Sequence, residues 1–486
     1  MNKVYINRWK ELLCDRRRKN DDREDLSLEN RGSTTSNTSE HRTEIERDHD
    51  RILFCTAVRR LADKTQVFPL ERNDSVRNRL THSHEVSNLA RSLGVSLVYR
   101  FDVAKDVRDA TRNIPALLAA IGLAHDLGNP PFGHQGEAAI QSWFKDNKED
   151  VAGKENKFLE ENIYNDFLKF EGNAQTFRLV TRLQLLNDNF GLDLTYATLS
   201  AMMKYTVGSS DTEDKSHVCK KKYGFFKSEE QIAEDVLKKV GLKKGERHPM
   251  AYIMEACDDI AYVVLDIEDA VKKGLASFSD LMAYLKHKAP SDKVTNEVVR
   301  LSLEKHDHYR GLNLSPAELN DVSMQRFRVY AIGEMVAATS AAFIDKQDSL
   351  ISGLQPSALL DLSTANVLRQ NLGTFAKTYA FQHRTVLEVE LRGYNTIRGL
   401  MNIFWSAIKA TDPNDPEKLP INPYNRYVYM RISENYRRIY NNPSPEVNIL
   451  PVRYRQCLLL TDMVSGMTDS YAVSLLDELN SFKSKY

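Results

Sequence analysis

Hydrophobic side chains recur every three or four residues along most of the chain after residue 50. The pattern is clearest over residues 86–97, 114–124 and 253–267. Apolar positions at this spacing are typical of amphipathic helices that pack one face against a core. Alternation of apolar and polar residues, which marks a half-buried strand, is rare, and residues 427–432 are its best short candidate. The pattern therefore predicts an all-α fold.

Two segments break the helical pattern. Residues 15–50 contain a run of charged residues followed by a stretch of small polar ones. This composition cannot bury enough apolar surface to offset the entropy of ordering, so we expect a mobile arm. Its RRRK run is best interpreted as a solvated charge cluster, with a phosphate contact as the alternative. The proline-rich residues 410–425 predict a loop between two groups of helices.

The composition narrows the class of protein. The chain has 486 residues, 42% of them hydrophobic, and its 67 Lys and Arg residues balance 67 Asp and Glu residues. It can therefore form a sizeable core, and its zero net charge gives no overall attraction for nucleic acid. The start lacks the apolar segment of a secretory signal, and no run reaches the roughly 20 apolar residues of a membrane span. Five scattered cysteines form no CxxC pair, so we expect a cytoplasmic protein with no membrane partner.

One short segment departs from ordinary helix sequence. After the apolar residues 114–124, His125 and Asp126 stand side by side, and a glycine and two prolines follow at once. Imidazole nitrogen and carboxylate oxygen form a mixed ligand set that suits several divalent metals. A His-Asp pair alone can also simply cap a helix. The pair is therefore a candidate metal site that needs further ligands.

Two other places offer such ligands. Upstream, His82 lies near the start of the helix predicted over residues 86–97. Downstream, Asp258 and Asp259 interrupt an apolar helical face, where an unpaired charge would be costly. A bound metal explains the burial of two carboxylates, and a salt bridge explains it equally well.

The order His82, then His125 and Asp126, then Asp258 resembles that of the HD superfamily of metal-dependent phosphohydrolases. Within it the chain resembles the dGTPase (deoxynucleoside triphosphate triphosphohydrolase) family, over most of residues 41–480. The matching blocks are HRTEIERDHDRILFCTAVRRLADKTQVFPLE (41–71), RLTHSHEV (79–86), AHDLGNPPFGHQGE (124–137), FEGNAQTFRL (170–179), LDLTYATLSAMMKY (192–205), KYGFFKSE (222–229), EACDDIAYVVLDIEDA (255–270), ELRGY (390–394) and SGMTDSYA (465–472).

The resemblance implies an all-α HD-domain helical bundle with an additional helical C-terminal lobe. It divides the chain into an N-terminal segment with a charged mobile loop (1–50) and an HD catalytic core (51–275). The helical C-terminal region (276–486) would complete the nucleotide pocket and form oligomer contacts. The family resemblance also implies a homo-oligomer, either a hexamer or a tetramer.

The resemblance further implies one divalent metal ion, whose ligands are His82, His125, Asp126 and Asp258. Asp258 is preferred over Asp259 because Tyr262 and Asp266 then follow at +4 and +8, the offsets that the family uses for nucleotide contacts. Asp259 is left with a supporting or ion-pair role. Mg or Mn is the expected ion, and Ni, Co, Fe or Zn would also suit these ligands.

Acid–base catalysis is assigned by the resemblance to His134 and Glu137. Residues three apart on a helix are neighbours, and we expect the carboxylate to orient the imidazole and raise its pKa. A surface ion pair is the alternative. The substrate-binding residues that the resemblance implies are Gln66, Val67, Lys204, Tyr262, Asp266, Phe381 and Glu390. Further phosphate candidates, undecided among themselves, are Arg59, Arg60, Arg77 and Arg79.

The implied reaction is metal-assisted hydrolysis at the α-phosphate of a deoxynucleoside triphosphate, with dGTP preferred, to deoxynucleoside and inorganic triphosphate. Two alternatives stay open: an HD nucleotidase or phosphodiesterase, and a regulatory protein that responds to nucleotides or single-stranded DNA. An allosteric dNTP or single-stranded DNA is thus a candidate partner. Residues 219–227, which mix Lys with aromatic residues, are the local candidate for a subunit or nucleotide contact, although a solvated loop is the simpler interpretation.

Overall fold

The fold is taken from a computed structural model of the chain. The structure describes residues 3–21, 41–68, 70, 73, 75–153, 162–184, 189–212, 214, 216–412, 415 and 418–483. Within these residues every regular element is a helix, and one isolated β-bridge pairs Arg17 with Thr195. The all-α prediction is therefore confirmed.

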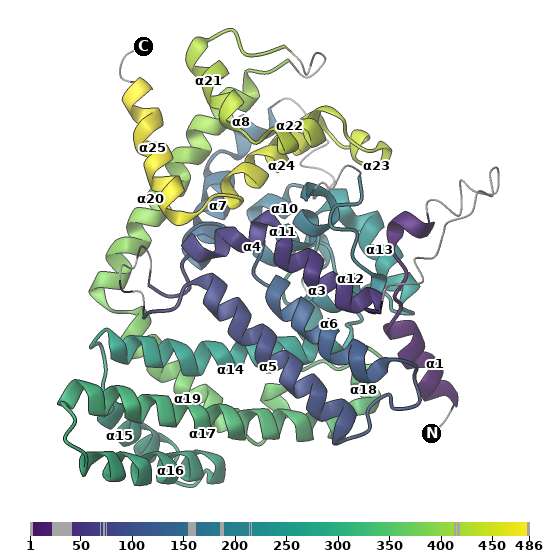
Figure 1. The fold of residues 1–486 in the computed structure, drawn as a ribbon. Helices are drawn as coiled ribbons and strands as arrows, with labels where there is room; N and C mark the ends of the chain where they lie inside the picture. Colours follow the sequence, from purple (N-terminus) through teal and green to yellow (C-terminus); the bar gives the residue numbers. More distant parts are fainter. Residues whose placement is uncertain are drawn as a thin grey trace.

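The first part of the chain contains a bundle around one apolar helix, α6, with further helices outside that bundle (Figure 1). Its α-helices are α1 (Lys3–Leu12), α3 (Glu44–Phe54), α4 (Thr56–Arg60), α5 (Arg79–Tyr99), α6 (Ala110–Ala124), α7 (Gly133–Asp146), α8 (Lys148–Ala152), α10 (Asn165–Leu168), α11 (Gly172–Arg178), α12 (Tyr196–Met202), α13 (Glu230–Lys239) and α14 (Pro249–Lys272). Short 3₁₀ or π turns join them: η1 (Leu61–Asp63), η2 (Leu179–Leu183), η3 (Ser209–Asp211), η4 (Val218–Lys220) and η5 (Lys227–Glu229).

Helix α6 is the centre of this bundle because it packs against α3, α5, α12 and α14. Its side chains are apolar on nearly every side and almost all are buried, as expected of a helix in a protein interior. Helix α5 approaches it closely at Gly122, where a Cβ atom would lie 2.8 Å from the Cα of Ser87. Since His125 directly follows α6, the central helix carries the His-Asp pair into the middle of the molecule.

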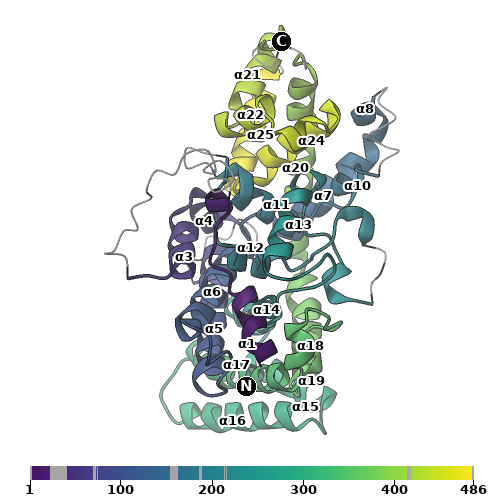
Figure 2. The same cartoon turned by 90° about the vertical axis from the view of Figure 1, so that its right-hand side faces the viewer.

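The second part of the chain comprises α15 (Phe278–Lys288), α16 (Lys293–Arg310), α17 (Pro316–Asp345), α18 (Gln347–Ile351), η6 (Leu360–Leu362), α19 (Asn366–Ala376), η7 (Lys377–Phe381), α20 (Arg384–Lys409), α21 (Pro423–Arg431), α22 (Glu434–Asn441), α23 (Pro445–Asn448), α24 (Val452–Ser465) and α25 (Asp469–Lys483). Helices α15–α19 gather below α14, whereas α21–α25 form the opposite end of the molecule (Figures 1 and 2). Helix α20 runs between the two groups and packs against α7. The additional helices therefore extend the core at both ends.

The charged residues near the N-terminus are anchored where the structure describes them. Arg17 is buried, and its guanidinium lies 2.8 Å from an oxygen of Asp48 and 2.7 Å from an oxygen of Glu44. Asp48 in turn accepts a hydrogen bond from the backbone N–H of Thr195 at 2.9 Å. The expected solvated cluster is thus wrong at Arg17, because a buried carboxylate from α3 pairs with it. Residues 22–40 of the predicted mobile arm lie outside the described residues.

The strand candidate at residues 427–432 is wrong, because helix α21 covers Pro423–Arg431. Asn422 caps this helix by accepting a hydrogen bond from the N–H of Asn425 at 3.0 Å, and Pro423 occupies the first turn. Proline there and Asn at the cap are strong start signals for a helix. The predicted loop is confirmed between α20 and α21, over residues 410–422 where they are described.

Among the described helices, α17 alone is long and apolar enough to cross a membrane by length and composition. It packs against α14 and α16, and Met324, Phe327, Ala331 and Met335 on one of its faces are buried. Helices in a protein interior pass the same test. Packing within the bundle accounts for the apolar residues on this face, whereas Val329 on α17 is 52% exposed.

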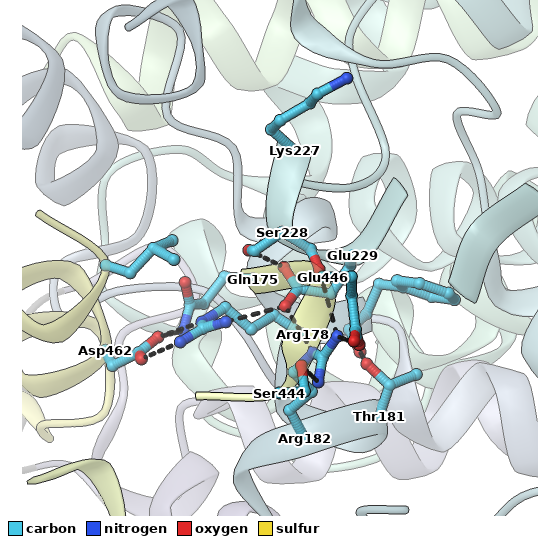
Figure 3. Close-up of polar contacts among 12 residues, drawn as sticks. Gln175, Arg178, Thr181, Arg182, Lys227, Ser228, Glu229, Ser444, Glu446 and Asp462 are labelled. Atoms are coloured by element: carbon cyan, nitrogen blue, oxygen red, sulfur yellow. Dashed lines mark hydrogen bonds and ion pairs between the residues drawn. The ribbon is translucent and has the colours of Figure 1, made fainter. Parts of the chain in front are cut away.

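A buried network of ion pairs joins α24 to the core (Figure 3). Arg178 of α11 lies between Asp462 and Glu229, with nitrogen–oxygen distances of 2.7 and 2.8 Å. Arg182 lies 3.1 Å from Glu229 and 2.7 Å from Glu446. Each charged group in this network thus faces an opposite charge, as buried charges require.

Candidate active site

A cavity of about 520 Å³ lies between the start of α5, the turn after α6, the start of α7 and the middle of α14. Residues of η7 and the first turns of α20 form another part of its wall. A volume of this size is within the roughly 300–1,000 Å³ of pockets that hold small molecules. Of the site residues predicted from the sequence, all but Asp266 line this cavity.

The four predicted metal ligands meet at one place in the cavity. Ligand atoms of His82, His125 and Asp126 lie within 4.8 Å of one another. Oδ1 of Asp258 lies 3.2 Å from Nε2 of His82 and 3.5 Å from Nε2 of His125. Oδ2 of Asp126 lies 3.3 Å from Nε2 of His125. Helices α5, α6 and α14 therefore bring together groups from three distant stretches of sequence.

The spacing of these atoms fits a divalent cation. Two ligand atoms, each about 2.1 Å from one ion and separated by an angle near 100°, lie about 3.2 Å apart. The buried Nε2 of His125 has no hydrogen-bond partner among the described residues. A buried polar atom without a partner destabilises a protein by roughly 1–3 kcal/mol, and a bound ion would remove that penalty. The residues present thus fit a metal site.

Hydrogen bonds around the ligands hold them in this orientation. Nδ1 of His125 and the carbonyl oxygen of Gly122 are hydrogen-bonded at 2.7 Å, which leaves Nε2 facing the cavity. Nδ2 of Asn129 donates to Oδ1 of Asp126 at 2.6 Å, and Arg79 contacts the other oxygen. Bonds of this kind fix the tautomer and the ring orientation of metal-binding histidines.

The charges around the imidazoles favour a cation. Burial favours the neutral form of His125, yet the carboxylates of Asp126 and Asp258 raise its pKa to about 9. Burial also opposes ionisation of Asp258, but His125, His82 and Lys204 hold its pKa below its usual range. Burial raises the pKa of Asp259 to about 7. Geometry and charge therefore both favour Asp258 over Asp259 as the ligand.

His134 and Glu137 are neighbours in the first turn of α7, with Nδ1 of His134 4.0 Å from Oε2 of Glu137. The His134 side chain is 88% exposed and faces the cavity, whereas Glu137 is buried. Oε1 of Glu137 accepts a hydrogen bond from the N–H of Gly172 at 2.7 Å. The carboxylate is thus fixed in place beside the imidazole.

The expected rise in the pKa of His134 is wrong. The ring faces open space, but the surrounding cavity walls disfavour its charged form, and the positive charges of Arg79 and Lys222 add to this, so the pKa is lowered. Burial and the neighbouring Glu171 raise the pKa of Glu137 to about 8, so this carboxyl is largely protonated near neutral pH. It therefore offers little negative charge to the imidazole. The spacing of the two residues in sequence does not reveal this protonation state.

Of the four candidate arginines, Arg79 lines the cavity and the other three do not. Arg77 is held by Glu268 and Asp269 at 2.7 and 2.6 Å, and Arg60 donates to the backbone carbonyl of Gly466. Arg59 is exposed. Arg79 is thus the one positioned to meet an anion in this cavity.

Two lysines line the same cavity. Nζ of Lys204 lies 3.4 Å from Oε1 of Glu255 and 3.8 Å from Oδ2 of Asp258. Burial opposes the charged form of Lys204, but Glu255 and other nearby acidic groups outweigh it and raise the pKa of this lysine. Nζ of Lys222 lies 2.6 Å from Glu171. Both lysines are cationic near neutral pH and available to an anionic ligand.

Lys222 corrects the interpretation of residues 219–227 as a solvated loop. Tyr223, Phe225 and Phe226 in this segment are at most 1% exposed. The hydroxyl of Tyr223 also donates to the backbone carbonyl of Asp166 at 2.5 Å. The aromatic residues therefore anchor the segment in the core, and this packing positions Lys222 at the cavity.

The wall predicted to hold base and sugar is formed by Gln66, Val67, Tyr262, Phe381 and Glu390. The rings of Tyr262 and Phe381 lie 5.6 Å apart between centroids, and the Tyr262 residue is 39% exposed. Oε1 of Gln66 is buried and has no hydrogen-bond partner among the described residues. An apolar surface beside unpartnered polar groups is suited to a ligand with a flat ring and hydroxyl groups.

Asp266 lies one turn beyond Tyr262 in α14 and is fully buried. Neither of its carboxylate oxygens has a hydrogen-bond partner within the part of the chain that the structure describes. Burial and the nearby Asp269 raise its pKa well above the usual range. The structure thus places Asp266 behind the lining of the cavity rather than on it.

Sequence reasoning gave no individual role to several polar residues that line the cavity: Thr65, Asn129, Gln135, Glu171, Asn173 and Lys222, the last within the segment named as a candidate nucleotide contact. All but Lys222 lie inside the quoted blocks without a role of their own, often beside a glycine. Lys222 opens its block, directly before the aromatic residues that bury the segment. Their polar character within blocks that match the family was the signal from which they could have been identified.

Comparisons with known proteins agree with this site. A family profile described as HD domain matches residues 79–182. A deoxyguanosinetriphosphate triphosphohydrolase-like protein of Listeria innocua is 35% identical over 481 residues, which is 97% of this chain and 99% of the relative. A probable deoxyguanosinetriphosphate triphosphohydrolase of Pseudomonas aeruginosa is 33% identical, over 88% of this chain and 91% of its own. A deoxyguanosinetriphosphate triphosphohydrolase of Yersinia pestis is 32% identical, over 88% and 92%.

The chain belongs to the dGTPase-like family. It is therefore an HD-domain phosphohydrolase, and the HD domain implies dependence on a metal, in agreement with the cluster of His82, His125 and Asp126. The HD match ends at residue 182, so Asp258 of this dGTPase-like protein lies outside it. Packing of α14 against α5 and α6 brings this fourth group to the other three.

Proposed function

We propose that this dGTPase-like protein hydrolyses deoxynucleoside triphosphates, with dGTP preferred, to deoxynucleoside and inorganic triphosphate. The observation that supports this most is the convergence of two imidazoles and two carboxylates in a cavity that three cations also line. Metal ligands beside several cations suit a polyphosphate, because a metal ion and cationic side chains together neutralise its negatively charged oxygens.

The metal would be held by His82, His125, Asp126 and Asp258. When bound, a divalent cation supplies Lewis acidity toward phosphoryl oxygens and makes water more acidic. Arg79, Lys204 and Lys222 would bind the rest of the triphosphate and orient its α-phosphate, and such positioning accounts for much of the rate in phosphoryl transfer.

His134 would donate a proton to the departing 5′ oxygen. Its pKa is low in the protein alone, because the cavity walls disfavour its charged form and because Arg79 and Lys222 repel a third positive charge. A triphosphate beside these cations would neutralise them and raise the pKa of His134 toward neutrality. Glu137, fixed by the N–H of Gly172, would hold the imidazole in position.

The base and sugar would lie against the wall of Tyr262 and Phe381. Close packing of the Tyr262 ring beside C2′ would leave no room for a ribose hydroxyl, which selects deoxyribose. Glu390 presents a carboxylate, an acceptor that suits the N–H donors on the edge of guanine. The names of the relatives support the same base.

Product analysis tests this proposal. The purified protein is incubated with each dNTP, singly and in mixtures, with Mg²⁺ or Mn²⁺, and the products are separated by ion exchange. We expect inorganic tripolyphosphate and deoxynucleoside in equal amounts. The variant Asp126→Ala, purified in the same way, controls for contaminating phosphatases.

Other outcomes separate the alternatives. Monophosphate with pyrophosphate, or sequential loss of phosphate, would identify a nucleotidase or phosphodiesterase instead. No turnover together with binding of single-stranded DNA that weakens steeply with salt would favour the regulatory protein. Turnover with dNTP mixtures alone would support an allosteric dNTP, and the hexamer or tetramer stays a prediction that light scattering can check.

A further inference from the structure

The SGMTDSYA segment at residues 465–472 has no role in the proposed chemistry, yet its Asp469 touches the walls of the cavity. Asp469 opens helix α25 and is 2% exposed. One carboxylate oxygen accepts hydrogen bonds from the N–H of Thr65, at 3.0 Å, and from the Thr65 hydroxyl. The other oxygen accepts one from the N–H of Phe132 at 2.9 Å.

A buried lysine strengthens the same connection. Nζ of Lys64 donates to the carbonyl oxygen of Asn129 at 2.6 Å and to that of Ser465 at 2.9 Å. Lys64 is thus bonded to the turn at 129–132 and to the end of α24. Its neighbour Thr65 is bonded to the start of α25. We call Lys64, Thr65, Phe132 and Asp469 the Asp469 junction.

The junction holds two segments that carry site residues. Thr65 immediately precedes Gln66 and Val67, and its carbonyl oxygen accepts a hydrogen bond from Nε of Arg79 at 3.0 Å. On the other side, Phe132 immediately precedes α7, the helix of His134.

The backbone on that side is strained. Phe132 has a φ of 61°, a left-handed conformation that is unfavourable for a bulky residue. Such a conformation persists when surrounding contacts hold it, and the Asp469 carboxylate is one of them.

We propose that Asp469 is a positioning residue, which sets the base wall at Gln66 against the acid at His134. This inference rests on the proposed function for its kinetic consequence, but its structural part does not depend on turnover. The C-terminal helix α25 would then determine the geometry of a site to which it contributes no lining residue.

The variant Asp469→Asn tests the proposal because it keeps the volume but has one carbonyl oxygen in place of two acceptors. The milder variant Thr65→Val removes the hydroxyl bond and keeps the backbone N–H. Asp462→Asn is the matched control, since Asp462 is also a buried carboxylate of the same C-terminal helices and binds Arg178, which lies outside the cavity.

The first measurement is hydrogen–deuterium exchange of the peptides that cover residues 64–68 and 130–137. In Asp469→Asn we expect at least one of the amides of Thr65 and Phe132 to exchange about tenfold faster, and in Thr65→Val a smaller increase. Asp462→Asn should lower the melting temperature without this local change.

The second measurement is kinetic. For Asp469→Asn we expect kcat/KM for the dNTP to fall about 100-fold, because small misplacements of reacting groups cost this much. Affinities for Mn²⁺ and for inorganic tripolyphosphate should fall by much less than kcat/KM, because the junction reaches the ligand Asp126 only indirectly, through Arg79 and Asn129, and does not contact the two lysines. Asp462→Asn should keep kcat/KM well below its melting temperature.

The outcomes are distinct. Wild-type exchange rates at both amides in Asp469→Asn would overturn the inference, whatever the activity. Equal losses of activity in Asp469→Asn and Asp462→Asn, in proportion to their loss of stability, would also overturn it in favour of a purely structural role. If the wild-type protein releases no tripolyphosphate but the exchange change occurs, the proposed function fails and the junction stands.

Discussion

Two regions of this protein bury many polar and charged side chains, and they differ in whether groups without a partner lie beside a cavity. In the network of Figure 3, Arg178 and Arg182 each face two carboxylates at 2.7–3.1 Å. In the cavity, Nε2 of His125 and Oε1 of Gln66 have no hydrogen-bond partner among the described residues. The carboxylate oxygens of Asp266, which lies behind the lining of the cavity, also have no hydrogen-bond partner among these residues.

The comparison distinguishes charged groups that stabilise the fold from polar groups that a ligand would complete. Buried charges that are paired within the protein hold helices together, as Arg178 holds α11 to α24. Buried polar groups without a partner lower stability, so their presence beside a cavity points to a ligand that completes them. Removing groups from the two regions should therefore change different measured quantities.

The largest effect is expected from Asp126→Ala. Loss of this carboxylate should abolish Mn²⁺ binding by calorimetry and lower dNTP turnover by at least about 1,000-fold, since a catalytic metal contributes several kcal/mol. Asp259→Asn is the matched control and should still bind Mn²⁺. Full activity in Asp126→Ala would refute the assignment of the ligands.

His134→Ala should act on turnover without touching the metal. Loss of a general acid lowers kcat by about 100- to 10,000-fold, and the affinity for Mn²⁺ should not change. Glu137→Gln should cause a smaller loss, because Glu137 is already largely protonated near neutral pH. If Glu137→Gln is the more damaging variant, the proton donor has been misassigned.

Arg178→Met should unfold the protein more readily while leaving the cavity groups in place. Removing this cation leaves Asp462 and Glu229 buried without it, which costs about 3–5 kcal/mol in the free energy of unfolding. Urea unfolding measures this loss. Arg398→Met, which breaks a half-exposed pair with Asp146, is the control and should cost less than about 1 kcal/mol.

Asp166 is a buried carboxylate that, unlike Asp462 with its guanidinium donor in the network, has neutral hydrogen-bond donors. They include the hydroxyl of Tyr454 at 2.6 Å, the N–H of Lys227 at 2.7 Å and the side chain of Ser209. Burial raises the pKa of Asp166 from 3.8 to about 6. As pH rises from 3.8 to 6, the unfolded chain releases this proton first, so the free energy of unfolding falls by up to about 3 kcal/mol.

Asp166→Asn removes this pH dependence. The free energy of unfolding of the variant minus that of the wild type should therefore increase between pH 4 and pH 7, by up to about 3 kcal/mol. Urea titrations at several pH values measure the difference. A difference that does not change with pH would show that Asp166 is ionised in the folded protein at all these values.

Part of the site could be predicted because some of its residues differ in type from their neighbours in the sequence. His125 and Asp126 follow an apolar helix, and Asp258 lies on an apolar helical face, so both stand out from their surroundings. His82, Tyr262 and Lys204 were placed through resemblance, and the structure brings them to the same cavity. Arg79 could not be chosen among four arginines, because their directions depend on partners such as Asp269 for Arg77.

The sequence by itself determined that this protein is helical, which residues are candidates for binding metal, and to which family they point. These conclusions depend on spacing along one helix or on the order of motifs in the chain, and both can be established without knowing which residues meet in space. Tertiary structure alone decided that Arg17 is buried, that Lys222 faces the cavity and that the pKa of His134 is lowered rather than raised. Burial and charge at a point are sums over neighbours from distant parts of the chain, and no local pattern contains them.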